Sequence, residues 1–169
     1  MRIAEVLLED FDTEIGNTRR TLERVPEDKP DYQPHQKSTA LGRLALHCAT
    51  LPLFGYYLLS DDGMDLAAPK RPQAALAFTT RAHCLEELES SAAQCRQALA
   101  QATDPQMQEI FPFRMGAQTI SELSRLRTYQ RLFFNHLVHH TAQLGVYLRL
   151  LEIPVPALYG PSADEAWVG

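Results

Sequence analysis

The sequence has no apolar stretch long enough to cross a bilayer. Its longest apolar run, LPLFGYYLL at 51–59, falls well short of the roughly 20 residues that a membrane-spanning helix needs. The N-terminal segment MRIAEVLLEDFD carries acidic residues where a signal peptide has its apolar core. Neither membrane insertion nor secretion is therefore expected, and we predict a cytoplasmic protein.

Paired cysteines and clustered basic residues are missing as well. Cys48, Cys84 and Cys95 are the only 3 cysteines, and their spacing matches neither a zinc knuckle nor a Cys-x-x-Cys redox motif, so we expect reduced thiols. The 16 Lys and Arg residues are scattered, and the net charge is −5. Without a basic stripe to displace counterions from a phosphate backbone, no nucleic-acid partner is expected.

The composition that remains is that of an ordinary globular chain. Hydrophobic residues make up 45% and charged residues 22% of the 169 positions, unlike a disordered protein. A chain of this length buries roughly 70% of its unfolded surface around one core. We therefore predict a single domain over residues 1–169.

Apolar side chains recur with the helical period in most of the chain. The spacing predicts helices over 3–24, about 39–59 and about 75–102, and a last, longest helix that begins at Thr119 or Ser121. No segment alternates convincingly with a period of two. The expected fold class is all-α, a four-helix bundle.

Proline and glycine mark the connections between these helices. PEDKPDYQPHQKS at 26–38 and SDDGMDLAAPKRPQ at 60–73 are expected to be long surface connections. Residues 103–118 lose the helical period and are predicted to form a short extended excursion. The three prolines after Glu152 predict an extended C-terminal tail that lies across the bundle.

The segment NHLVHH at 135–140 places three histidines within the last helix. His136 and His140 are four residues apart, so their Cβ atoms lie about 5–6 Å apart on one helix face and both rings can point at one centre. That face also carries Leu137 and Leu144, which predicts a position in the interior. His139 is rotated by about 100° from His140 and is not expected to join the pair.

A third histidine strengthens the interpretation as a metal site. His47 lies between Leu44 and Leu51 on the apolar side of the second predicted helix and faces the same core. Three buried imidazoles are difficult to satisfy by hydrogen bonds, whereas one cation satisfies all three. His35 and His83 lack such support and are interpreted as ordinary histidines, and a His-x-x-x-His pair alone is more often a packed or exposed pair.

Two familiar metal motifs do not fit. A zincin has Glu directly after its first histidine, where this chain has Leu137. Di-iron bundles carry Glu-x-x-His on two helices, and this sequence has no such pair. What remains is a set of three histidines without a carboxylate. Three protein ligands leave coordination positions open, as in catalytic sites and unlike closed structural ones.

TALGRLALHCATLP, followed by FFNHLVHHTAQLGVYLRLLEIPVPALYGPSADE, resembles the DinB-like proteins, the DinB/YfiT superfamily of metalloenzymes, over nearly the whole chain. The resemblance implies a divalent metal, most often nickel or zinc, bound by one histidine of the second helix and a His-x-x-x-His pair of the last one. These positions are His47, His136 and His140. Relatives commonly have Arg after the second histidine of this pair, where this chain has Thr141 and keeps Gln143.

The resemblance also implies candidate activities. Some relatives look like thiol S-transferases or isomerases that use a low-molecular-weight thiol, held as thiolate by the metal, and relatives pair as homodimers. The alternatives are a non-catalytic, stress-associated metal-binding protein and a metal-dependent hydrolase. Tyr57, Gln143 and Tyr147 are candidate walls of the site, although both tyrosines also suit core packing. The catalytic residues stay unassigned, and the expected partner is a small-molecule substrate.

Overall fold

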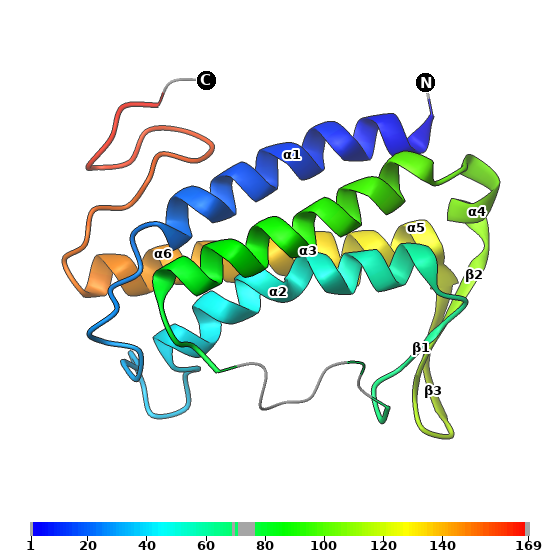
Figure 1. Ribbon diagram of the computed structural model, residues 1–169, viewed down its shortest axis with the longest axis horizontal. Coiled ribbons are helices and arrows are strands. Elements are labelled where there is room, and N and C mark those ends of the chain that lie inside the picture. The colour runs from blue at the N-terminus through cyan, green and yellow to red at the C-terminus, as the bar shows by residue number, and fades with distance from the viewer. Residues whose placement is uncertain (1, 69, 71–76, 168–169) are drawn as a thin grey trace.

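The computed structural model describes residues 2–68, 70 and 77–167. Three long helices, α1 (Ile3–Leu22), α2 (Leu41–Ser60) and α3 (Arg81–Gln101), are followed by the short helix α4 (Asp104–Gln108). The last helical segment consists of α5 (Arg125–Thr128), a π-helical turn η2 (Tyr129–Phe134) and α6 (Asn135–Leu150). The strands β1 (Met64–Asp65), β2 (Ile110–Met115) and β3 (Gln118–Ser124) lie between them in sequence. Figure 1 shows the sheet at one end of the long helices.

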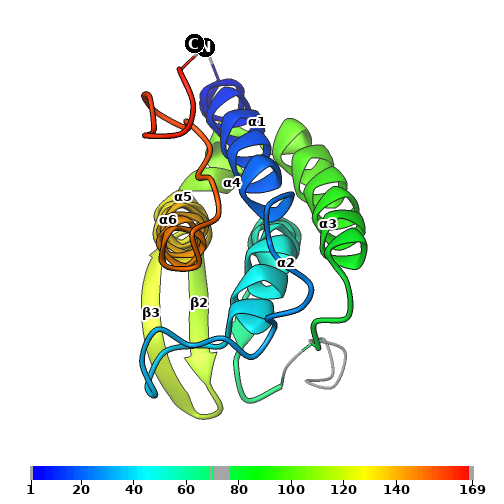
Figure 2. The ribbon, with the colours of Figure 1, turned by 90° about the vertical axis from the view of Figure 1, so that its left-hand side faces the viewer.

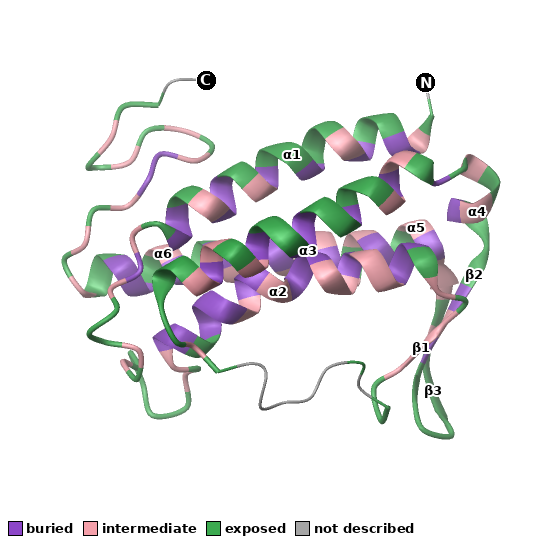
Figure 3. Cartoon of the chain, viewed as in Figure 1, coloured by how far each residue is buried: buried purple, intermediate pink, exposed green. Residues whose placement is uncertain are grey.

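The long helices pack because each one buries an apolar face. α2 contacts both α3 and α6, and α1 contacts the same two helices from the other side, so that their inner faces meet around a common core (Figure 2). Burial follows this arrangement, with the buried stripes turned inward and the exposed ones outward (Figure 3). The core is built largely from aromatic and leucine side chains, among them Phe11, Leu58, Leu88, Tyr129 and Phe133. Such packing contributes about 1.5–3 kcal/mol for each large side chain that is removed from water.

The expected all-α class is wrong, because the chain forms a three-stranded mixed sheet. β1 pairs with β2 in parallel, and β2 pairs with β3 in an antiparallel hairpin. Gly116 closes the hairpin with a φ of 58°, a left-handed conformation that glycine adopts at little cost. The last helix was predicted to begin at Thr119 or Ser121, but both residues lie in β3, and the helix begins at Arg125.

Residues 152–167 contain no helix or strand and are held against the helices by charged side chains. Glu165 pairs with Arg20 of α1 and with Arg24, which follows the end of that helix, and Asp164 pairs with Arg149 of α6. Figure 1 shows this segment beside the ends of α1 and α6. Within the described part of the chain, no helix is both long and apolar enough to cross a membrane.

Candidate metal centre

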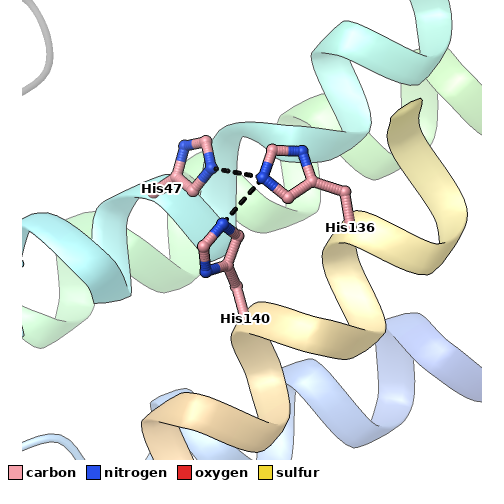
Figure 4. A group of neighbouring side chains, drawn as sticks. All are labelled: His47, His136 and His140. Carbon is pink, nitrogen blue, oxygen red and sulfur yellow. Dashed lines mark hydrogen bonds between the residues drawn. The ribbon is translucent and has the colours of Figure 1, made fainter. Parts of the chain in front are cut away.

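Three histidines from two helices meet at the contact between α2 and α6. His136 and His140 are one helical turn apart on α6, and His47 comes from α2. Each offers one ring nitrogen, and the three nitrogens all lie within 4.8 Å of one another. Figure 4 shows the rings turned toward a common point between the two helices. The chain thus brings together the three positions that the sequence singled out.

The cluster lies at the edge of the core and not inside it, which corrects the interior position expected from the sequence. All three histidines are half-buried, while their apolar neighbour Leu137 is fully buried. The histidine face of α6 therefore borders the core instead of pointing into it. One side of the cluster remains reachable from solvent.

A π-helical turn directly precedes the His136–His140 pair. The N–H of Asn135 bonds to the carbonyl of Gln130, five residues back, which defines the wide turn. The carbonyl of Leu132 in the same turn lies 3.3 Å from Nδ1 of His136. Because a carbonyl only accepts, His136 donates its Nδ1–H to Leu132. Wide turns of this kind are frequent at functional sites.

The second α6 histidine is oriented by a side chain. Nδ1 of His140 lies 2.7 Å from Oε1 of Gln143, so that His140 donates its Nδ1–H to the amide oxygen. A neutral imidazole carries a single ring proton, which leaves Nε2 of both His136 and His140 as acceptors. In metal sites, an outer partner fixes the tautomer of a ligating histidine in the same way.

The distances between the Nε2 atoms test whether a cation fits. Nε2 of His136 lies 2.7 Å from Nε2 of His140 and 3.4 Å from Nε2 of His47 (Figure 4). A hydrogen bond across the shorter distance requires one ring to be protonated or to lose its Nδ1 partner. A shared cation satisfies both lone pairs and leaves both Nδ1 bonds in place, and nitrogen ligands of a first-row metal lie about 3 Å apart.

Protonation of these rings is disfavoured. Burial, with smaller contributions from the nearby His140 and His136, lowers the pKa of His47 from 6.5 to about 4. Burial also lowers the pKa of His136 and of His140, although the bonds to Leu132 and Gln143 oppose that effect. The three rings are therefore neutral near pH 7, which is the form that binds metals.

The other histidines do not join the cluster. His139 is exposed on α6 and is not one of the clustered ligands, although its ring lies edge to face with that of His140, with the centroids 5.0 Å apart. His35 is exposed in the connection between α1 and α2, where its Nδ1 accepts from the N–H of Lys37. His83 lies on α3, 3.8 Å from a carboxylate oxygen of Glu87. The group of possible ligands found among the described residues contains no carboxylate.

A cavity of about 650 Å³ opens beside the cluster, with His47 and His136 among its lining residues. Its walls come from α2, from β1 and the residues that flank it, and from β2, η2 and α6. Phe54 of α2 meets Phe113 of β2 edge to face within this wall, at a centroid separation of 6.3 Å. The sheet that the sequence analysis missed thus supplies part of the site. The sequence did contain one sign of strand β2: Phe111 and Phe113, two residues apart on either side of Pro112, are both buried, as on one face of a strand.

The remaining candidate residues take three different places. Tyr57 lines the cavity, as a wall residue would. Tyr147 is buried in the core, and its hydroxyl donates to the carbonyl of Thr39 at 2.9 Å. Thr141, which stands where relatives commonly have Arg, is 3% exposed and shares a 2.9 Å hydroxyl bond with Thr18 of α1. That position serves the contact between α1 and α6 in this chain.

Comparison with known proteins gives one family. The sequence model of the DinB superfamily matches residues 10–144. No curated protein matches the chain significantly.

Three solved structures have similar folds, and two of them are described as DinB-like proteins. A DinB-like protein from Bacillus cereus has a TM-score of 0.68 at 20% identity, covering 92% of this chain and 97% of its own. A DinB-like protein from Bacillus subtilis has a TM-score of 0.67 at 18% identity, covering 88% and 94%. A conserved protein from Enterococcus faecalis has a TM-score of 0.65 at 17% identity, covering 89% and 97%. At these identities the likeness concerns the fold.

Proposed function

The chain belongs to the DinB superfamily, and from that membership and the three-histidine cluster we propose that it is a metal-dependent enzyme of the thiol S-transferase type. His47, His136 and His140 are the proposed ligands of one divalent transition metal. The main support for a metal is that the Nε2 atoms of His136 and His140 lie 2.7 Å apart and are both acceptors. The single proton of each ring is on Nδ1, where it bonds to Leu132 or Gln143.

Nickel or zinc is the proposed metal, because imidazole nitrogens suit both. Three neutral ligands leave the full charge of the cation uncompensated, which favours an anionic fourth ligand. When bound, the metal supplies a positive charge that keeps a coordinated thiol in its thiolate form. In the reaction class proposed here, the sulfur bonds to an electrophilic carbon and a leaving group departs.

The chain's own residues prepare this site in two ways. Leu132 and Gln143 hold the protons of His136 and His140 away from the centre, so that both Nε2 atoms remain free. The cavity beside His47 offers room for a small molecule, which a purely metal-storing protein does not need. A hydrolase is less well supported, because the described cluster includes no carboxylate to act as a general base.

The proposal includes a cytoplasmic location and a homodimer. Three buried cysteines without disulfides suit a reducing compartment. Val146 and Leu150 lie one turn apart on α6 with 59% and 53% of their surfaces exposed, and they offer a contact for a second copy. The proposed dimer would be refuted if sedimentation gave only monomer at high protein concentration.

Cobalt substitution tests the thiol-binding function. Cobalt(II)-loaded protein is titrated with 2-mercaptoethanol, and an intense sulfur-to-cobalt charge-transfer band is expected. The His140→Ala variant, which lacks one ligand, should not develop the band, and His139→Ala should develop it fully. If the cobalt spectrum of the wild-type protein stays unchanged at saturating thiol, the S-transferase function is wrong and a metal-binding or hydrolytic role replaces it.

A further inference from the structure

The cavity beside the histidines has a chemical character that the metal centre alone does not define. We propose that it holds the uncharged, apolar body of a compound whose head group binds at the three-histidine centre. The inference rests on the proposed metal-dependent function and adds the class of ligand. The ligand joins a metal-binding atom to a hydrocarbon or aromatic body.

The position of the cavity connects it to the centre. His47 and His136 contribute both to the cluster and to the cavity wall, so a ligand in the cavity reaches the open side of the centre. The volume of about 650 Å³ lies within the 300–1,000 Å³ range of sites that enclose a small organic molecule. One compound can therefore occupy both places at once.

The cavity walls are mainly hydrocarbon. Apolar side chains from four elements line the cavity: Leu51 and Phe54 of α2, Leu132 of η2, Phe113 of β2 and Met64 of β1. An uncharged alkyl or aryl group gains from leaving water for such a wall, whereas a sugar or carboxylate would lose its hydration without replacement.

The charged groups of the wall already have partners. Lys70 forms an ion pair with Asp61, and its ammonium lies 4.6 Å from the ring centroid of Tyr57. Oδ1 of Asp65 accepts from the backbone N–H groups of Ala67 and Gly116, each at 2.8 Å. Because Lys70 and Asp65 already have partners among the described residues, neither needs a charged ligand to neutralise it. This favours an uncharged ligand body.

Leu66 provides a place to change the cavity without disturbing the fold. Its side chain lines the cavity and is 41% exposed, while its backbone N–H bonds to the carbonyl of Arg114. Leu66→Glu places a carboxylate in the apolar wall and leaves the core intact. Leu150→Glu is the matched control, because Leu150 is 53% exposed on α6 and does not belong to the cavity.

Two ligand series separate the cavity from the metal. Primary alcohols from ethanol to hexanol are titrated into metal-free protein, with the methyl NMR signal of Met64 as the readout and that of the exposed Met115 as the internal reference. The matching alkanethiols and 2-mercaptoethanol are titrated into cobalt(II)-loaded protein, with the charge-transfer band as the readout.

In both series we expect affinity to rise about three- to fourfold with each methylene that enters the cavity. Leu66→Glu should weaken hexanol and hexanethiol about tenfold and leave 2-mercaptoethanol unchanged, and Leu150→Glu should change neither.

The outcomes distinguish the two proposals. If alcohols bind with the expected chain-length dependence but no thiol alters the cobalt spectrum, the apolar cavity stands and the S-transferase function falls. If thiols bind cobalt with equal affinity at every length and Leu66→Glu has no effect, the metal function stands and the apolar ligand class is overturned. If alcohols leave the Met64 signal unmoved and thiols leave the cobalt spectrum unmoved, both proposals are wrong.

Discussion

Acid should destabilise the metal-free protein through His47. The pKa of this ring is about 4 in the folded chain, against 6.5 for an unperturbed histidine. Between these two pH values the unfolded chain binds more protons than the folded chain, so the free energy of unfolding falls as the pH is lowered. The contribution of His47 is complete above pH 6.5 and is lost as the pH drops toward 4.

The size of the effect follows from the two pKa values. The interval between 6.5 and about 4 corresponds to roughly 3 kcal/mol at about 1.36 kcal/mol per pKa unit. The ring is only partly buried, so solvent reduces the desolvation and screens the neighbouring charges, and we reduce the expected loss to about 2 kcal/mol. This is a large share of the 5–15 kcal/mol that typically stabilises a domain.

Urea unfolding in the presence of a chelator measures this loss. The free energies of unfolding of wild-type protein and His47→Leu are compared at pH values from 7.5 to 4.5, so that the titration of all other groups largely cancels. The wild-type protein should lose about 2 kcal/mol more than His47→Leu over this range. His35→Gln, a change at an exposed histidine, should follow the wild type. Parallel pH profiles for wild type and His47→Leu would refute the argument.

Three further substitutions test other contacts. Gln143→Leu removes the acceptor that orients His140 and should weaken metal binding 10–100-fold in a chelator competition, whereas Gln143→Glu should retain it. Arg125 is buried and donates to two carbonyls at the end of α2, at 2.7 and 2.6 Å, so Arg125→Met should cost about 2–4 kcal/mol in urea unfolding; a loss below 0.5 kcal/mol would contradict this role. Thr141→Val breaks the buried bond to Thr18, and a double-mutant cycle with Thr18→Val should give a coupling energy of about 1 kcal/mol; a value near zero would show that the bond does not stabilise the protein.

The long helices and the histidine positions were predictable because they depend on local spacing. Helical periodicity placed α1 and α2 within about two residues of their observed bounds. The four-residue interval between His136 and His140 fixed their common face, and the apolar neighbours of His47 indicated which side of α2 faces α6. These are short-range patterns that a helix converts directly into geometry.

The sheet was not predictable in the same way. Leu123 and Leu126 have the spacing of a helix, so the last helix was predicted to start before Arg125. Leu123 in fact lies in β3, opposite Phe111. β3 shows no alternation of buried and exposed residues, because much of it is exposed. Its strand conformation depends on pairing with β2, a contact that the local pattern of residues does not encode.

The half-buried position of the histidines was also not predictable from the sequence. The apolar residues beside His136 and His140 indicate a buried face, but the cavity beside them arises where η2, β1 and β2 meet α2. That junction brings together residues from 47 to 136 and depends on the missed sheet. The three clustered histidines could therefore be named in advance, whereas the cavity in front of them could not.

The central claim is that His47, His136 and His140 share one metal ion. Metal content after loading with zinc or nickel and exhaustive dialysis, compared between His140→Ala and His139→Ala, tests it most directly. The two residues are adjacent on one helix, and only the direction of the side chain separates them. The account predicts that His139→Ala retains about one metal ion per chain, as the wild-type protein does, and that His140→Ala loses it. Equal loss in both variants, or full retention by His140→Ala, would contradict the three-histidine centre.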